Sequence, residues 1–138
     1  MRLRPRIVDL FQPGEMQSER DHKLESHESS PGEFNAKKFR HAFNGGWFSF
    51  ELKVDPSVKN DLSLTFWGSD NRRAFDVLVD DQLLVHQKLV GRPANQFFET
   101  VVPIPAEMIK GKKTIRVKVV APKDGWAGGL FGVRVLRG

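Results

Sequence analysis

The sequence contains no cysteine and no tyrosine among its 138 residues. The lack of cysteine excludes a disulfide framework, a thiol nucleophile and a metal site with thiolate ligands, and it leaves the cellular compartment open. No apolar run approaches the ~20 residues of a membrane-spanning helix, so we predict no membrane partner. The basic opening, residues 1–6, is not followed by the apolar segment of a signal peptide. One hypothesis is that the chain is part of a longer protein.

The net charge of +5 makes nucleic acid a partner to consider. However, acidic and basic residues are nearly balanced over residues 1–100, and the excess lies in residues 101–138. Lysines of this kind protect a solvated edge strand, and no RNA- or DNA-binding module accompanies them. We therefore predict no nucleic-acid partner. The basic residues concerned fall in a turn and on the wet face of one predicted strand, and they are Lys110, Lys112, Lys113, Arg116 and Lys118.

The clearest pattern in the chain lies in residues 45–55, where two glycines precede a faultless alternation. Phe48, Phe50 and Leu52 point to one face, and Trp47 points to the other with polar neighbours. Side chains of a strand alternate between faces with period two, so this segment is predicted to be a central strand with one buried face. A large aromatic on the polar face is not needed for packing, which makes Trp47 a candidate binding residue.

The rest of the chain predicts an all-β domain. Alternating segments separated by proline and glycine turns are typical of an antiparallel β-sandwich. Strand order cannot be read from this pattern; a jelly roll is the first choice of topology and an immunoglobulin-like sandwich is the second, and that choice rests on the family resemblance described below. The length fits a single domain over residues 1–138. The further strands are predicted at residues 6–11, 62–67, 75–79, 83–90, 97–104, 115–119 and 131–135, with a helical turn at 105–111 and a tight turn at Asp80-Asp81. Strand parity predicts that Phe48, Phe50, Leu64, Phe66, Val77, Val117 and Val133 are buried.

Three segments show no regular period and are predicted to be loops: residues 15–44, 68–73 and 122–129. The first is unusually long for a compact domain, and such loops are commonly functional or wrapped on the core. Its spaced phenylalanines are expected to pack on the surface of the sandwich.

Several short segments together resemble the β-sandwich domain at the C-terminal end of bacterial glycoside hydrolases of the β-L-arabinofuranosidase type, which is similar to galactose-binding-like jelly rolls. The resemblance runs from about Val8 to Leu136. It implies an accessory domain cut from a larger, periplasmic or extracellular hydrolase, whose zinc-bound cysteine and acidic residues lie in a separate helical barrel. This chain has no cysteine, so the resemblance implies a non-catalytic domain. The segments are residues 13–17, 21–22, 40–42, 45–50, 67–70 and 127–132.

Tryptophans with polar neighbours are the candidate ligand-binding residues. A sugar ring has an apolar face that stacks on an indole, and nearby polar groups bind its hydroxyls. The alternative is that the segment 15–44 covers the outward indoles with Phe34, Phe39 or Phe43. The domain would then pack against its parent catalytic domain, or serve as a protein-interaction module, instead of binding carbohydrate. The candidate residues are Trp67, Asp70, Arg72 and Trp126, followed by Trp47, Arg40 and Asn44.

Catalysis and metal binding are poorly supported by the sequence. Asp70 and Asp76 could form a carboxylate pair for glycoside hydrolysis, but seventeen acidic residues always offer such pairs. His22 and His27, with neighbouring acidic residues, fit no zinc-ligand spacing, so we predict no metal and no cofactor, with a structural calcium as the open alternative. His22 is expected instead to hold the long loop through a hydrogen bond.

Overall fold

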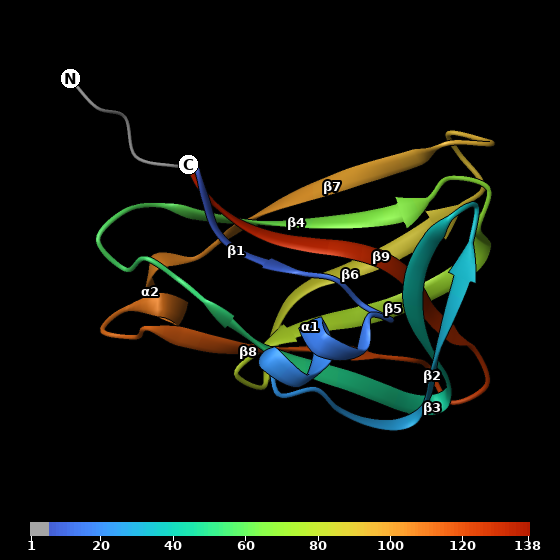
Figure 1. Ribbon diagram of the computed structural model, residues 1–138, viewed down its shortest axis with the longest axis horizontal. Coiled ribbons are helices and arrows are strands. Elements are labelled where there is room, and N and C mark those ends of the chain that lie inside the picture. The colour runs from blue at the N-terminus through green and yellow to red at the C-terminus, as the bar shows by residue number, and fades with distance from the viewer. Residues whose placement is uncertain (1–5) are drawn as a thin grey trace.

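The computed structural model describes residues 6–138, and residues 1–5 of the basic opening lie outside this range. Most of the described chain is antiparallel strand (Figure 1). The elements are β1 (Ile7–Phe11), α1 (Met16–Asp21), β2 (Glu25–Phe34), β3 (Lys37–Lys53), β4 (Asn60–Trp67), β5 (Asn71–Val79), β6 (Gln82–Val90), β7 (Phe97–Ile104), α2 (Ala106–Ile109), β8 (Thr114–Val120) and β9 (Trp126–Arg137). No helix in this range is long and apolar enough to cross a membrane.

The strands form a jelly-roll sandwich, which confirms the predicted fold class. One layer has the order β6-β5-β8-β3, the other β7-β4-β9-β1, and β2 pairs with β3. The two layers are joined into a nearly closed sheet because β3 belongs to both. Residues 47–53 of β3 pair with β8, whereas residues 40–43 pair with β9. The strand bends between these halves at Asn44 and Gly45, whose φ angles are 52° and 79°.

The core fills the space between the layers and follows the predicted parity. All seven residues expected inside are buried. Phe50 is fully buried and its ring stacks on that of Phe11 with centroids 4.3 Å apart. The predicted turn at Asp80-Asp81 is also confirmed, since both residues have the positive φ that a tight hairpin requires, 46° and 69°. The predicted helical turn is α2.

The prediction of an irregular segment at 15–44 is wrong. This segment holds α1, β2 and the first part of β3. The carboxylate of Glu15 caps α1 by accepting hydrogen bonds from the backbone N–H groups of Ser18 at 2.6 Å and Gln17 at 3.1 Å. The sequence does not indicate β2, because this strand pairs on one side only and most of its side chains are exposed. It therefore lacks the alternation of apolar and polar residues that marks a half-buried strand. Likewise, β5 begins inside the expected loop 68–73 and β9 inside 122–129.

The prediction that the lysine-rich strand lies at a sheet edge is also wrong. β8 lies between β5 and β3. Its outward cations have partners: Arg116 donates to Ser49 Oγ at 2.8 Å, and the Lys118 ammonium lies 4.4 Å from the centre of the Trp47 indole. Lys112, just before the strand, pairs with Asp80 at 2.7 Å.

Candidate functional site

A pocket of about 410 Å³ opens at the end of the sandwich where β4 ends, β9 begins and the β2–β3 hairpin folds over. These backbone segments lie at the right in Figure 1. The pocket brings together Trp67, Asp70 and Trp126, three of the candidate residues predicted from the sequence. We call it the aromatic pocket. Its lining is Glu33, Phe34, Phe39, His41, Trp67, Ser69, Asp70, Arg73, Trp126, Gly129 and Phe131.

Aromatic rings form two walls of this pocket. Trp67 lies at the end of β4, where Phe66 points inward and the next side chain therefore points out. Its indole makes T-shaped contacts with the rings of Phe34 and Phe97, with centroids 5.1 Å and 4.8 Å away. Trp126 is 47% exposed and contacts His41. Phe34 of the hairpin therefore covers part of Trp67, as in the alternative in which segment 15–44 covers the outward indoles. Trp126 stays open.

A fixed arginine and a carboxylate lie beside the indoles. Arg73 Nη1 donates to the carbonyl of Gly128 at 2.8 Å and lies 3.5 Å from an oxygen of Asp70. Its guanidinium also lies 5.9 Å from the centre of the Trp126 ring. Arginine offers several N–H donors in one plane and a carboxylate offers only acceptors, so the pair presents both kinds of partner that neighbouring hydroxyls need.

His41 forms the back of the pocket on β3. Its Nε2 lies 2.8 Å from Ser30 Oγ. Burial lowers the pKa of His41, and the positive charges of Arg73 and Arg40 lower it further. The imidazole is therefore held neutral at neutral pH, when one ring nitrogen donates and the other accepts.

A β-bulge in β9 brings the ring of Phe131 into the wall of the aromatic pocket. In the pairing of β9 with β4, Thr65 lies opposite Gly132 and Phe66 opposite Leu130, so Phe131 forms a β-bulge. The bulge turns the Phe131 ring to the outside, where it meets Phe39 and Phe97 at 5.1 Å and 4.9 Å. Parity with Val133, which is predicted to be buried, would put Phe131 on the inner face, and nothing in the local sequence indicates the bulge.

Four predicted residues lie outside the aromatic pocket. Arg72 sits at a register shift in β5 with a φ of 58°, which leaves the neighbouring Arg73 in the pocket. Trp47 is on the opposite part of β3, beneath Lys118. Arg40 is buried in an ion pair with Glu19. Asn44 forms the bend of β3.

The remaining sequence hypotheses concerned acidic and histidine residues. The carboxylate of Asp76 on β5 lies 2.7 Å from Nδ1 of His86 on β6, and Asp76 does not line the aromatic pocket. His22 makes the predicted kind of hydrogen bond: it lies between the carbonyl of Ser18 at 2.7 Å and Asp9 at 3.1 Å, and so ties α1, in place of the expected loop, to β1. Among residues 6–138, no three His, Asp or Glu side chains gather in a way that could hold a metal ion.

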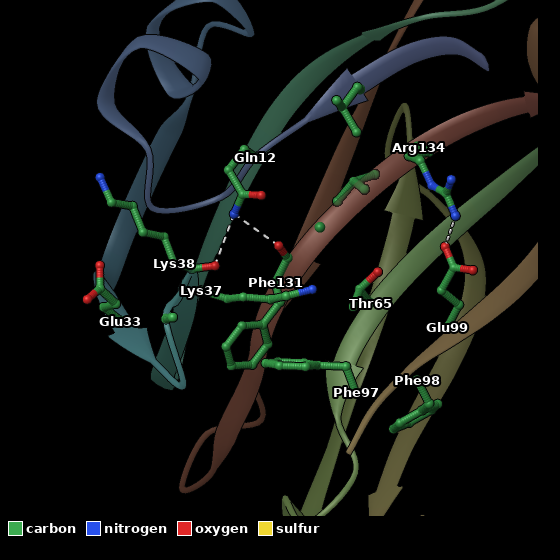
Figure 2. Close-up of a pocket in the computed structure, with 14 residues that line it drawn as sticks. Gln12, Glu33, Lys37, Lys38, Thr65, Phe97, Phe98, Glu99, Phe131 and Arg134 are labelled. Atoms are coloured by element: carbon green, nitrogen blue, oxygen red, sulfur yellow. Dashed lines mark hydrogen bonds and ion pairs between the residues drawn. The ribbon is translucent and has the colours of Figure 1, made fainter. Parts of the chain in front are cut away.

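A second hollow, which we call the groove, has a volume of about 760 Å³ and is shown in Figure 2. It adjoins the aromatic pocket, because Glu33 and Phe131 line both. Gln12 and Lys38 lie on one side, and Arg134 with Glu99 on the other. The hydrogen bond from Ser63 and the contact with Arg134 lower the pKa of Glu99, so it stays ionised to lower pH. Its lining is Leu10, Gln12, Glu33, Ala36, Lys37, Lys38, Thr65, Phe97, Phe98, Glu99, Phe131, Gly132, Val133 and Arg134.

The Asp70 carboxyl is expected to titrate above the pKa of an exposed aspartate. Burial raises its pKa, and the nearby Arg73 guanidinium opposes the rise only in part. Because the folded-state pKa is raised, the contribution of this group to stability is fully present below the unfolded-state pKa and is lost as the pH rises through the folded one. NMR titration of the carboxyl carbon measures this. Arg73→Gln should raise the midpoint further, and a midpoint at or below that of an exposed aspartate would contradict the expectation.

Solved structures with a similar fold include carbohydrate-binding modules and an enzyme. A family 35 module from Clostridium thermocellum is 11% identical with a TM-score of 0.61, covering 94% of this chain and 97% of that one. A module of Cellvibrio mixtus lichenase 5A, in complex with cellotriose, is 10% identical with a TM-score of 0.60, covering 96% and 98%. An exo-β-1,3-galactanase from Phanerochaete chrysosporium, with β-1,3-galactotriose, is 14% identical with a TM-score of 0.65, covering 94% of this chain and 29% of that one. The protein thus shares the antiparallel β-sandwich fold of these modules.

The sequence itself identifies a narrower group. Residues 2–136 match a family of unknown function, DUF6805, and the chain belongs to this family. No curated protein is similar to it in sequence.

Proposed function

We propose that this domain is a non-catalytic carbohydrate-binding module whose ligand binds in the aromatic pocket. The observation that carries the proposal is the joining of an open indole with a fixed arginine–carboxylate pair in one cavity, at Trp126, Arg73 and Asp70. The indole offers the flat surface on which the C–H face of a sugar stacks, and the polar pair binds its hydroxyls. The similar fold of modules named for carbohydrate binding supports it.

The domain would serve a larger enzyme. We propose that it is an accessory domain of a glycoside hydrolase, of the β-L-arabinofuranosidase type that the sequence resembles. The exo-β-1,3-galactanase supports this, because the part with a similar fold makes up only 29% of that chain and so belongs to a larger enzyme. The alternative partner is the parent catalytic domain itself, in an architectural role. The described apolar residues available for such packing include Ile7, Leu83 and Val101, which are about half exposed but are spread over three strands.

The test is a titration of the purified domain with β-1,3-galacto-oligosaccharides and arabino-oligosaccharides, followed by tryptophan fluorescence. We expect affinities of millimolar to micromolar order, because an open site buries few ligand atoms. If neither series binds at tens of millimolar, the architectural alternative is favoured.

Trp67→Ala is expected to weaken binding by about tenfold or more. The substitution removes an aromatic wall against which the sugar would pack, and a tenfold loss of affinity corresponds to only about 1.4 kcal/mol. Trp47→Ala is the matched control, because Trp47 lies outside the pocket and its loss should leave the affinity unchanged. Loss of binding in Trp47→Ala with none in Trp67→Ala would place the ligand elsewhere.

A further inference from the structure

We propose that the aromatic pocket and the groove are consecutive subsites of one cleft, which binds a glycan chain of several sugar units instead of a single terminal sugar. This inference rests on the proposed function, since the chain would enter the groove from the sugar bound in the aromatic pocket.

The two hollows share part of their walls. Glu33 and Phe131 line both of them. Phe97, a groove residue, has its ring 4.8 Å from that of Trp67 in the pocket and 4.9 Å from that of Phe131. The aromatic surface therefore continues from one hollow into the other, and Figure 2 shows the rings of Phe131 and Phe97 side by side at one end of the groove. A ligand that stacks in the pocket would meet further aromatic surface as it leaves.

The groove is polar enough to bind hydroxyls along its length. The carboxamide nitrogen of Gln12 donates to the carbonyls of Lys38 and Phe131, each at 3.0 Å, which fixes the side chain and leaves its oxygen as an acceptor. On the other side, Glu99 is held by Arg134 and by Ser63, whose hydroxyl donates to it at 2.8 Å. Donors and acceptors that are already positioned cost little ordering entropy on binding.

Lysine and glycine complete the shape of the groove. The ammonium of Lys37 lies 4.6 Å from the centre of the Phe97 ring, where it keeps a donor at the rim. Gly132 lies on β9 opposite Thr65 of β4. Because it has no side chain, the groove is deeper at this point. The charged groups around it favour a hydroxyl-rich ligand over an apolar protein surface, since burying them against an apolar partner would cost free energy.

A substitution at Gly132 can close the groove without disturbing the fold. A Cβ built at this residue would meet Thr65 Oγ1 at 3.4 Å and Cβ at 3.6 Å, which is ordinary contact. The side chain of Gly132→Leu would therefore extend into the groove. Arg134→Ala is a second variant that removes a donor from the groove wall. It breaks an ion pair whose side chains are 34% and 42% exposed, and surface pairs typically contribute about 0–1 kcal/mol. Arg72→Ala is its matched control, because Arg72 lines neither hollow.

The experiment is isothermal titration calorimetry with galactose and the β-1,3-galacto-oligosaccharides up to the hexasaccharide, and with arabinose and its α-1,5-linked oligomers. For the wild-type domain we expect the affinity to rise by about tenfold or more from monosaccharide to hexasaccharide in the series that binds. Gly132→Leu and Arg134→Ala should remove most of this rise and leave the monosaccharide affinity unchanged. Arg72→Ala should behave as the wild type.

Two results would overturn the inference without touching the proposed function: an affinity that is independent of chain length, or a full rise with length in both groove variants. Failure of every sugar in both series to bind the wild-type domain would overturn the inference together with the proposed function.

Discussion

Phe50→Ala is expected to lower the free energy of unfolding by about 3–5 kcal/mol, as measured by urea denaturation. The ring is fully buried at the centre of the sandwich and stacks on Phe11, so its loss removes apolar burial and leaves a cavity that rigid strands on both sides cannot fill. The matched control is Phe34→Ala, because the side chain of Phe34 is 47% exposed, and we expect it to cost less than about 1 kcal/mol. A similar cost for both variants would contradict the position of Phe50 in the core.

Arg40→Leu is expected to destabilise the domain by about 3–5 kcal/mol, because it leaves the Glu19 carboxylate buried without its counter-charge. Arg40 Nε and Nη2 donate to the two oxygens of Glu19 at 2.7 Å and 3.1 Å, and the two side chains are 9% and 12% exposed. The pair joins α1 to the first half of β3. The measurement is the shift of the denaturation midpoint at constant slope.

The double variant Arg40→Leu with Glu19→Gln tests the cause of this loss. The uncharged amide oxygen of the glutamine can still accept from the backbone N–H of Gly14, which donates to Glu19 at 2.8 Å. We expect the double variant to regain part of the stability lost by Arg40→Leu alone. A double variant that is less stable than Arg40→Leu would show that the arginine acts through packing and not through charge.

The sandwich and its core could be predicted because strand parity is a strong signal wherever one face is buried. Phe48, Phe50 and Val117 alternate with polar residues, and each lies inside as expected. The pairing partners could not be predicted in this way. β8 has the same alternation as an edge strand, and only the three-dimensional order of the strands shows that it lies between β5 and β3.

The candidate site could be predicted only where parity holds up to the end of a strand. Trp67 follows the inward Phe66 and therefore faces out, which placed it correctly at the surface. Bulges break this reasoning because they shift parity by one residue, and for this reason Phe131 lies on the outer face. Arg72 was chosen because it follows Trp67 in an expected loop, but β5 begins at Asn71, and it is Arg73 that lines the aromatic pocket. His41 was missed because the first half of β3 was taken for a loop.

The bend of β3 at Asn44 and Gly45 ties the alignment of one layer to that of the other. A strand that slips by one residue against its neighbour exchanges its inner and outer faces. In this domain such a slip would have to occur in both layers together, with the buried phenylalanines of the second half and the pocket residues of the first half changing sides at once. Alternative pairings of β3 are therefore disfavoured in both layers, and the alignment that buries the core residues also determines which side chains line the aromatic pocket.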